Sequence, residues 1–173
     1  MPGYRYDLFQ TPLGWIAILV SERGVRRVGF RPTPDEAIAD LGPDLDRAVQ
    51  DSESLRWLRE KLLAYIGGDS SATDDVKLDT EGATPFFQRA WEACRSIPTG
   101  ETRSYAWLAA AAGNPAAFRA AGQAMARNRF ALIVPCHRVI GSDGGLHGYG
   151  GGLDKKARLL EQERLAADRR RVS

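Results

Sequence analysis

Hydrophobic and polar residues alternate along the first thirty residues in the pattern of short β-strands. The alternation predicts strands at residues 4–10, 15–20 and 24–30. The segments between them, 11–14 and 21–24, contain the glycine, proline and polar residues that favour turns. We therefore predict that the chain begins with three strands joined by tight turns.

Helical spacing replaces this alternation in the rest of the first half. Residues 31–51 are polar and contain three prolines, so we expect only a short helix at about 35–41. A longer helix, ended by a pair of glycines, is predicted by the spacing of Leu55, Leu58, Leu62, Tyr65 and Ile66. After a polar linker at 69–75, residues 76–78 are expected to return as an edge strand. Together these elements predict a small α/β domain over residues 1–80.

The second half is predicted to form a mainly helical domain over residues 84–167, followed by a basic tail at 168–173. Thr84 and Pro85 are typical of a helix start, with a capping threonine before a proline in the first helical position. The apolar face of this helix consists of Phe87, Ala90, Trp91, Cys94 and Ile97. Cys94 is therefore expected in the core.

Two further short helices are predicted, separated by a tight turn. Ser104 is expected to cap a helix over 105–112, and a second helix is expected over about 114–126. Such a pair is typical of a helix-turn-helix, although an αα-hairpin inside a helical domain is more common. The second helix is rich in alanine, so it can lie close to a neighbouring helix or to a DNA groove.

The composition is that of a soluble globular protein. Of the 173 residues, 43% are hydrophobic and 27% are charged. No apolar run is long enough to span a membrane, and the N-terminus lacks the apolar core of a signal peptide. Only Cys94 and Cys136 occur, far apart, which argues against a disulfide framework and fits a reducing cytoplasm.

Charge is distributed unevenly between the two halves. Residues 1–81 contain 10 basic and 15 acidic side chains, a net charge of −5, whereas residues 82–173 contain 14 basic and 7 acidic, a net charge of +7. The basic half also contains Cys136, where a polyanion such as nucleic acid would be attracted. Ordinary surface variation can produce the same asymmetry, so charge supports nucleic-acid binding without establishing it.

The most distinctive chemistry lies in the apolar segment 133–140. Pro135 fixes its own backbone and restricts the residue before it, which places Cys136 on a rigid turn beside strand-like segments. A thiol is a strong nucleophile only as a thiolate, and an adjacent base such as His137 is a common means of forming it. Most cysteines in apolar runs are core residues, so the dipeptide alone does not decide between these interpretations.

The sequence Pro-Cys-His-Arg-Val at residues 135–139 resembles the active-site signature of the O6-alkylguanine-DNA alkyltransferases, and the similarity covers about 84–163. The resemblance implies a ribonuclease-H-like first domain and a winged-helix-like second domain with a helix-turn-helix. It also implies DNA repair by direct reversal. The alkyl group of O6-alkylguanine, and also of O4-alkylthymine, would pass from duplex DNA to Cys136 after the base is flipped.

The resemblance assigns catalytic roles to six residues. Cys136 would be the nucleophile, His137 its base acting through a water, and Glu163 the residue that orients and charges the histidine. Asn128 would tie the active-site turn together by hydrogen bonds. Two donors would stabilise the leaving guanine, namely Tyr105 and Lys156. Without the resemblance, Lys156 and Glu163 would be assigned to a solvated helix face.

The resemblance also implies how the flipped base is held. The carbonyls of Cys136 and Val139 would accept from its exocyclic amine, the amide of Gly150 would donate to O6, and Tyr149 would line the pocket. Gly150 stands where some members have serine, and residues 128–130 replace a frequent Asn-Pro. These departures leave the pocket size and the constraint on that loop open.

Contacts with the duplex are implied for three more residues. Arg119 would enter from the minor groove and fill the gap left by the extruded base. Asn114 and Ser142 would contact the DNA backbone. The minor groove distinguishes sequences poorly, which suits a protein that searches for damage anywhere.

A thioether product has no easily expelled leaving group, so the resemblance implies one turnover per molecule, as in a suicide enzyme. No cofactor is expected. No metal is expected either, because the N-terminal zinc ligands of some members are missing from this sequence. We expect a monomer in the cytoplasm, associated with the nucleoid and not with membranes. The sequence leaves open whether copies bind DNA cooperatively.

Three rival interpretations compete with this one. A Cys–His hydrolase normally takes its histidine from a distant segment, not from the next residue. A protein that binds damage without repairing it would, in this family, have tryptophan in place of Cys136. A zinc site from Cys136, His137 and His147 lacks the usual spacing of four ligands.

Overall fold

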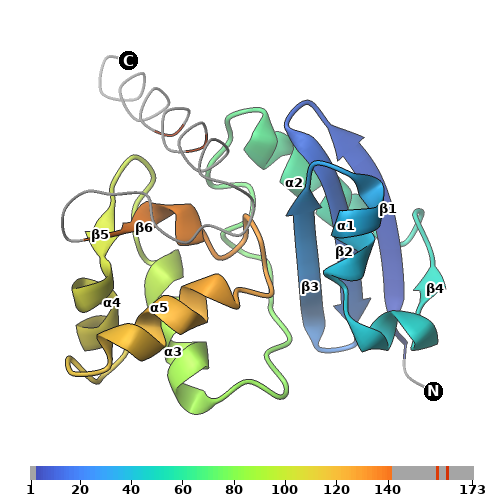
Figure 1. Ribbon diagram of the computed structural model, residues 1–173. Coiled ribbons are helices and arrows are strands. Elements are labelled where there is room, and N and C mark those ends of the chain that lie inside the picture. Colours follow the sequence, from blue (N-terminus) through green and yellow to red (C-terminus); the bar gives the residue numbers. More distant parts are fainter. Residues whose placement is uncertain (1–2, 142–158, 160–162, 164–173) are drawn as a thin grey trace. The chain divides into compact units, whose positions relative to one another are not determined.

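The computed structural model describes residues 3–141, 159 and 163, and the chain divides into two compact units (Figure 1). The first unit comprises residues 1–81 and 129–133, and the second comprises 82–128 and the chain from residue 134. The return of residues 129–133 to the first unit was not predicted from the sequence. The predicted basic tail at 168–173 lies outside the described residues.

Three antiparallel strands form the centre of the first unit. They are β1 (Arg5–Thr11), β2 (Gly14–Ser21) and β3 (Gly24–Arg31). The three strands predicted from alternation are thereby confirmed, each end to within one residue. A fourth strand, β4 (Val49–Gln50), pairs parallel with β1 and completes a mixed sheet of order β3-β2-β1-β4. Two exposed residues carry no hydrophobic pattern, so β4 could not be recognised from the sequence.

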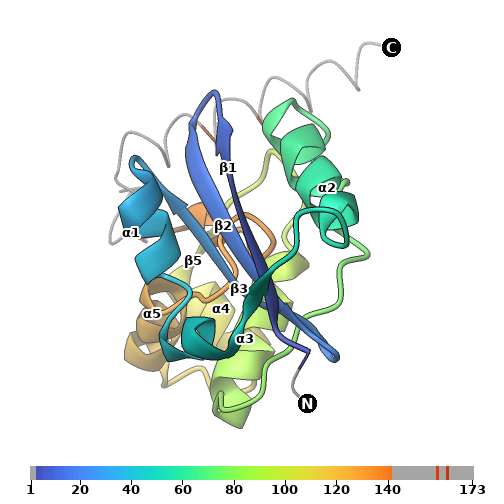
Figure 2. The same ribbon diagram turned by 90° about the vertical axis from the view of Figure 1, so that its right-hand side faces the viewer.

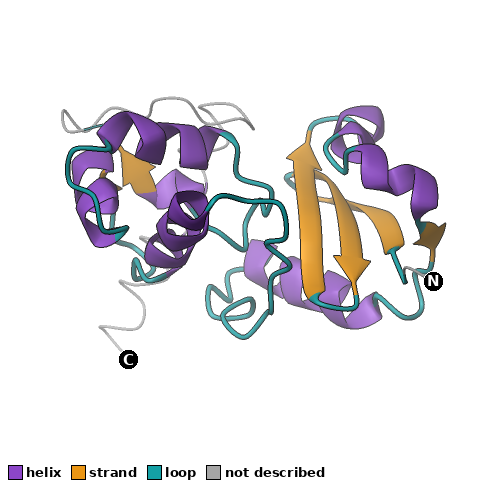
Figure 3. Cartoon of the chain, turned by 90° about the horizontal axis from the view of Figure 1, so that it is seen from below, coloured by secondary structure: helices purple, strands orange, loops and turns teal. Residues whose placement is uncertain are grey.

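Helices cover both faces of this sheet (Figures 2 and 3). Helix α1 (Pro34–Ala39) is followed by a 3-10 turn, η1 (Pro43–Arg47), and by α2 (Arg56–Ile66), and both predicted helices are confirmed. The α1 side of the sheet contributes Ala17 and Leu19 to a buried cluster with Ala37 and Leu41. The alternate residues Ile16 and Ile18 are also buried. Because β2 is covered on both faces, its sequence is a continuous apolar run.

The open edge of β3 is covered by two chain segments that return to it. Leu78 bridges to Val25, and Phe130 bridges to Val28. The predicted edge strand at 76–78 is therefore reduced to a single bridge. Gly24 makes this approach possible, because a β-carbon there would lie 2.5 Å from the carbonyl oxygen of Lys77. Covering the edge removes a surface on which other chains could pair.

The second unit is built on three short helices. They are α3 (Pro85–Arg95), α4 (Tyr105–Ala111) and α5 (Phe118–Ala126). The predicted caps are confirmed, because Thr84 accepts from the amide of Phe87 and Ser104 from that of Trp107. Cys94 is buried, as predicted.

The start of α5 differs from the prediction. The helix begins at Phe118 and not at residue 114, because the side chain of Asn114 accepts a hydrogen bond from the amide of Ala116 at 3.1 Å. An asparagine that bonds to the backbone two residues ahead holds a turn in place of a helix. The connection between α4 and α5 is therefore longer than predicted.

A buried hydrogen bond and a pair of short strands help to hold the elements of the second unit together. The indole nitrogen of Trp91 on α3 donates to the carbonyl of Ala124 on α5 at 2.9 Å. Strand β5 (Arg103–Ser104) pairs parallel with β6 (Val139–Ile140).

The detailed likenesses to ribonuclease H and to winged-helix proteins stay predictions. No helix in the described part of the chain has both the length and the apolar character needed to cross a membrane.

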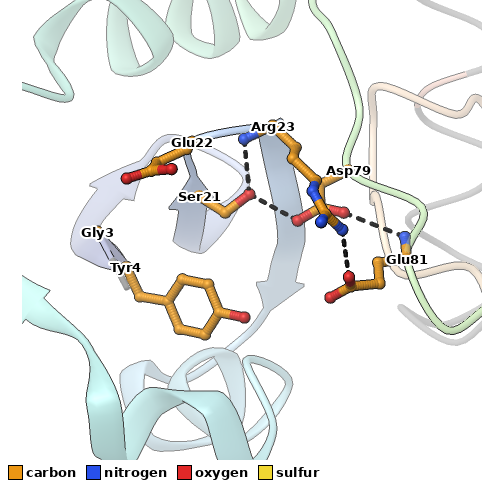
Figure 4. Close-up of a pocket in the computed structure, with 7 residues that line it drawn as sticks. All are labelled: Gly3, Tyr4, Ser21, Glu22, Arg23, Asp79 and Glu81. Atoms are coloured by element: carbon orange, nitrogen blue, oxygen red, sulfur yellow. Dashed lines mark hydrogen bonds and ion pairs between the residues drawn. The ribbon is translucent and has the colours of Figure 1, made fainter. Parts of the chain in front are cut away.

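Asp79 attaches the end of the first unit's chain to the turn between β2 and β3 (Figure 4). Its side chain is buried, and it accepts from the hydroxyl of Ser21 at 2.6 Å and from the amide of Glu81 at 3.1 Å. Nη1 of Arg26 lies 3.3 Å from Oδ2 of Asp79. Burial alone would raise the pKa of Asp79, but these hydrogen bonds and the charge of Arg26 hold it below its ordinary value. Ser21, Arg23, Asp79 and Glu81 line a surface pocket and are linked to one another by hydrogen bonds, whereas Glu22 lines the same pocket and is exposed.

We expect Asp79→Asn to lower the free energy of unfolding at pH 7 by about 1–3 kcal/mol, because an amide cannot satisfy all of these donors. Since the folded pKa of Asp79 is depressed, its contribution is complete above the ordinary value of 3.8 and is lost as pH falls below it. Denaturant unfolding between pH 7 and pH 3 measures both effects. Glu22→Gln, an exposed residue of the same pocket, is the matched control. Equal stability of the two variants would contradict the assignment.

Candidate active site

Cys136 is the single partly exposed residue in an otherwise buried turn. Val134, Pro135, His137, Arg138 and Val139 are all buried, whereas Cys136 is at intermediate exposure. Residues Cys136–Arg138 form a 3-10 turn, η2, closed by a hydrogen bond of 2.9 Å from the amide of Arg138 to the carbonyl of Pro135. The sulfur is therefore carried by a closed backbone turn, as expected from the position of Pro135.

The side chain of Asn128 holds the entry to this turn. Its amide nitrogen donates to the carbonyl of Val134 at 2.9 Å, which links the end of α5 to the residues that precede the cysteine. The family resemblance implied that Asn128 would tie the turn together. The observed hydrogen bond is of the predicted kind, and its importance for activity stays a prediction.

The short parallel sheet brings the start of α4 next to the cysteine turn. Arg103 pairs with Val139 and Ser104 with Ile140, so Tyr105 follows directly from a strand that is paired beside η2. Burial, and then the neighbouring thiols of Cys136 and Cys94, raise the pKa of Tyr105 above its ordinary value. Its hydroxyl therefore stays protonated near neutral pH and can donate a hydrogen bond.

His137 and Glu163 meet in the interior of the second unit. The Nε2 atom of His137 lies 3.2 Å from Oε1 of Glu163, and the two residues are 0% and 4% exposed. The two residues are 26 positions apart in the sequence. Contact with a buried carboxylate fixes the orientation of the imidazole.

Arg138 is the second side chain that binds Glu163, and the sequence alone assigned it no role. Its Nε donates to Oε1 of Glu163 at 2.8 Å and its Nη2 to Oε2, a bidentate pair inside the protein. Its Nη1 also donates to the carbonyl of Ile97 at 2.7 Å. An arginine within an apolar run was the available signal, because a buried guanidinium requires a carboxylate partner.

The charge of Glu163 is stabilised by these two neighbours. Burial alone would raise the pKa of its carboxyl, but hydrogen bonds from Arg138 and His137, together with their positive charges, lower it to about 2. Glu163 is therefore a carboxylate at every physiological pH. Its negative charge is shared between an arginine that is permanently charged and a histidine that can gain a proton.

The structure places the other expected site residues in three groups. Val139 is buried in β6. Arg119 is exposed on α5, and Asn114 is exposed in the turn before it. Ser142, Tyr149, Gly150 and Lys156 lie outside the described residues, as does His147 of the rival zinc site. Within the residues that the structure describes, no three potential metal ligands cluster.

Comparisons with known proteins decide the family. Residues 85–165 match the family described as 6-O-methylguanine DNA methyltransferase, DNA binding domain. The methylated-DNA–protein-cysteine methyltransferase of Methanosarcina acetivorans is 42% identical over 158 residues, which cover 91% of this chain and 97% of that protein. The chain belongs to the methylated-DNA–protein-cysteine methyltransferase family.

Solved structures of this family resemble the whole fold. Mycobacterium tuberculosis OGT in complex with DNA has a TM-score of 0.79 and 36% identity, and the match covers 94% of each chain. The O6-methylguanine-DNA methyltransferase of Pyrococcus kodakaraensis has a TM-score of 0.69 and 26% identity, over 92% of this chain and 98% of that one. The family resemblance read from residues 84–163 is thereby confirmed and extends to the first unit.

We expect Glu163→Gln to destabilise the fold by about 3–5 kcal/mol, because Arg138 would stay buried without a carboxylate. The double variant Arg138→Met, Glu163→Leu removes both charges and should recover much of this loss. Because the pKa of Glu163 falls from 4.5 to about 2 on folding, its stabilisation is complete above pH 4.5 and disappears as pH approaches 2. Urea unfolding of the three proteins between pH 7 and pH 3 measures this. A double variant as unstable as Glu163→Gln would contradict the pairing.

Proposed function

We propose that this protein repairs alkylated DNA by transferring the alkyl group from O6 of guanine in duplex DNA to the sulfur of Cys136. The observation that carries the proposal is the single partly exposed thiol in a buried turn whose next residue contacts a buried carboxylate. Membership of the family supports the reaction class, and the DNA complex of the Mycobacterium tuberculosis relative supports the partner.

The transfer is an in-line displacement at the alkyl carbon. The thiol loses its proton through a water to His137, and the sulfur forms a bond to carbon as the carbon–oxygen bond breaks. The electron pair of the broken bond goes to O6 of guanine. With Nε2 engaged by Glu163, the proton path from the thiol runs to Nδ1 of His137. The carboxylate of Glu163 stabilises the imidazolium that results.

The leaving guanine needs a donor where its negative charge develops. Tyr105 directly follows β5, the strand that pairs with β6 just after the cysteine turn, and its hydroxyl is protonated. A donor that is already positioned in a partly buried site stabilises such a charge without reorganisation. Lys156 is proposed as the second donor. The product at Cys136 is a thioether, so each molecule acts once.

The base reaches the thiol by leaving the duplex. We infer that α5 docks in the minor groove, that Arg119 fills the space of the extruded base, and that Asn114 and Ser142 contact the backbone. Val139, Tyr149 and Gly150 would hold the flipped base. O4-alkylthymine is proposed as an additional substrate. The protein would act as a monomer, without metal or cofactor, on DNA in the cytoplasm.

Intact-protein mass spectrometry tests the central step. After mixing with duplex DNA that contains one O6-methylguanine, we expect a gain of about 14 Da that stops at one methyl per chain and lies on the Cys136 peptide. Cys136→Ser should gain nothing, whereas Cys94→Ser should gain the same mass as the unmodified protein. Continued turnover would identify a hydrolase. Binding to the lesion without any mass change would identify a protein that recognises damage without repairing it.

Tyr105→Phe tests the donor. Removing one positioned donor from a developing negative charge slows such reactions on the order of 100-fold. We therefore expect the single-turnover rate constant of alkyl transfer to fall by about this factor. Alkylation of Cys136 by iodoacetamide expels iodide and requires no donor, so its rate should change little. Equal slowing of both reactions would show that Tyr105 shapes the turn and does not act on the leaving group.

A further inference from the structure

Phe118 is a large apolar side chain that the second unit leaves in solvent. Four large hydrophobic residues are exposed among those that the structure describes, and three of them, Val49, Trp57 and Leu63, belong to the first unit. Phe118 is 54% exposed and is the first residue of α5. Single exposed hydrophobic residues are common, so its surroundings decide whether it has a role.

The exposed row of α5 that begins at Phe118 contains no other large side chain. Gly122 lies one helical turn further along, and a β-carbon added there would meet nothing within 4 Å. Residues four apart share one helix face, so the ring of Phe118 stands at the end of a stripe of bare backbone that continues to the exposed Ala126. A helix with this profile can approach a large partner closely, and Phe118 is its most prominent apolar group.

The distribution of charged residues around α5 indicates the chemistry of the partner that this helix would bind. Between Glu101 and Asp143 the sequence has no acidic residue and five arginines. Two of these arginines, Arg119 and Arg127, are exposed at the two ends of α5. Arg138 is paired with Glu163 and Arg103 with Glu101, so the positive charge that this segment offers to a polyanion lies mainly on Arg119 and Arg127. An apolar ring beside exposed arginines fits duplex DNA, whose grooves combine charged phosphates with the apolar faces of sugars and unstacked bases.

We propose that Phe118 is a further DNA-contacting residue, and that its ring packs against sugar and base in the minor groove next to Arg119. The inference rests on the proposed function, since it assumes that α5 docks on DNA. Apolar side chains inserted at base steps hold a duplex in a distorted form. Phe118 would thus help to keep the duplex open while the alkylated base is outside it.

Phe118→Ala in the full chain tests the contact by two measurements. In a Cys136→Ser background, the Kd for a 20-base-pair duplex should rise about tenfold, because a base–aromatic contact contributes a factor of this size. The slope of log Kd against log salt concentration should not change, since the ring neutralises no phosphate. With Cys136 present, alkyl transfer from the methylated duplex should slow, whereas transfer from free O6-benzylguanine, which brings no duplex, should not.

Two further variants complete the test. Trp57→Ala removes an aromatic side chain of similar exposure, 43%, from α2 of the first unit, and should alter neither measurement. Phe118→Trp keeps an aromatic ring and should restore tight binding. Binding by Phe118→Ala within twofold of the parent, or equal slowing with the free base, would overturn the proposal. If the parent protein itself transfers nothing from either substrate, the proposed function fails, while the duplex Kd still tests Phe118.

Discussion

The pairing of one buried carboxylate with an arginine and a histidine is the constraint that shapes the cysteine turn. Both carboxylate oxygens of Glu163 accept hydrogen bonds from Arg138, and Nε2 of His137 lies 3.2 Å from Oε1. Removing an ion from water costs several kcal/mol, and only close hydrogen-bonded partners offset that cost. His137 and Arg138 are neighbours in sequence, and both must reach the same carboxylate. This requirement fixes the backbone of η2, and with it the direction in which Cys136 faces.

The remainder of the second unit supports this arrangement through short contacts. Arg138 also donates to the carbonyl of Ile97, just after α3, and Asn128 fixes the carbonyl of Val134 from the end of α5. The β5–β6 pair places Tyr105 at the start of α4 beside the same turn. Contacts from the ends of three helices therefore hold the cysteine turn, and α4 itself begins with Tyr105. A nucleophile held in this way loses little conformational freedom when its substrate arrives.

The proposed chemistry makes different demands on different parts of the chain. Around the thiol the structure is buried and closely paired, because proton transfer and displacement require fixed geometry. Along α5 the exposed row that follows Phe118 consists of glycine and alanine, and the helix contains no acidic side chain. The sheet of the first unit, whose open edge is covered by Leu78 and Phe130, contributes none of the residues in the proposed reaction.

Local patterns determined much of this protein from the sequence alone. Alternation gave the three long strands, helical spacing gave α2 and α3, and Thr84 and Ser104 marked two helix starts, because these features depend on residues only a few positions apart. The Cys136–His137 pair was recognisable for the same reason. Tertiary structure alone decided other partners that are distant in sequence: Arg138 on Glu163, the parallel pairs that form β4 and β5–β6, and the return of residues 129–133. Such contacts are selected by burial and charge compensation across the folded chain, and no local window of sequence contains both partners.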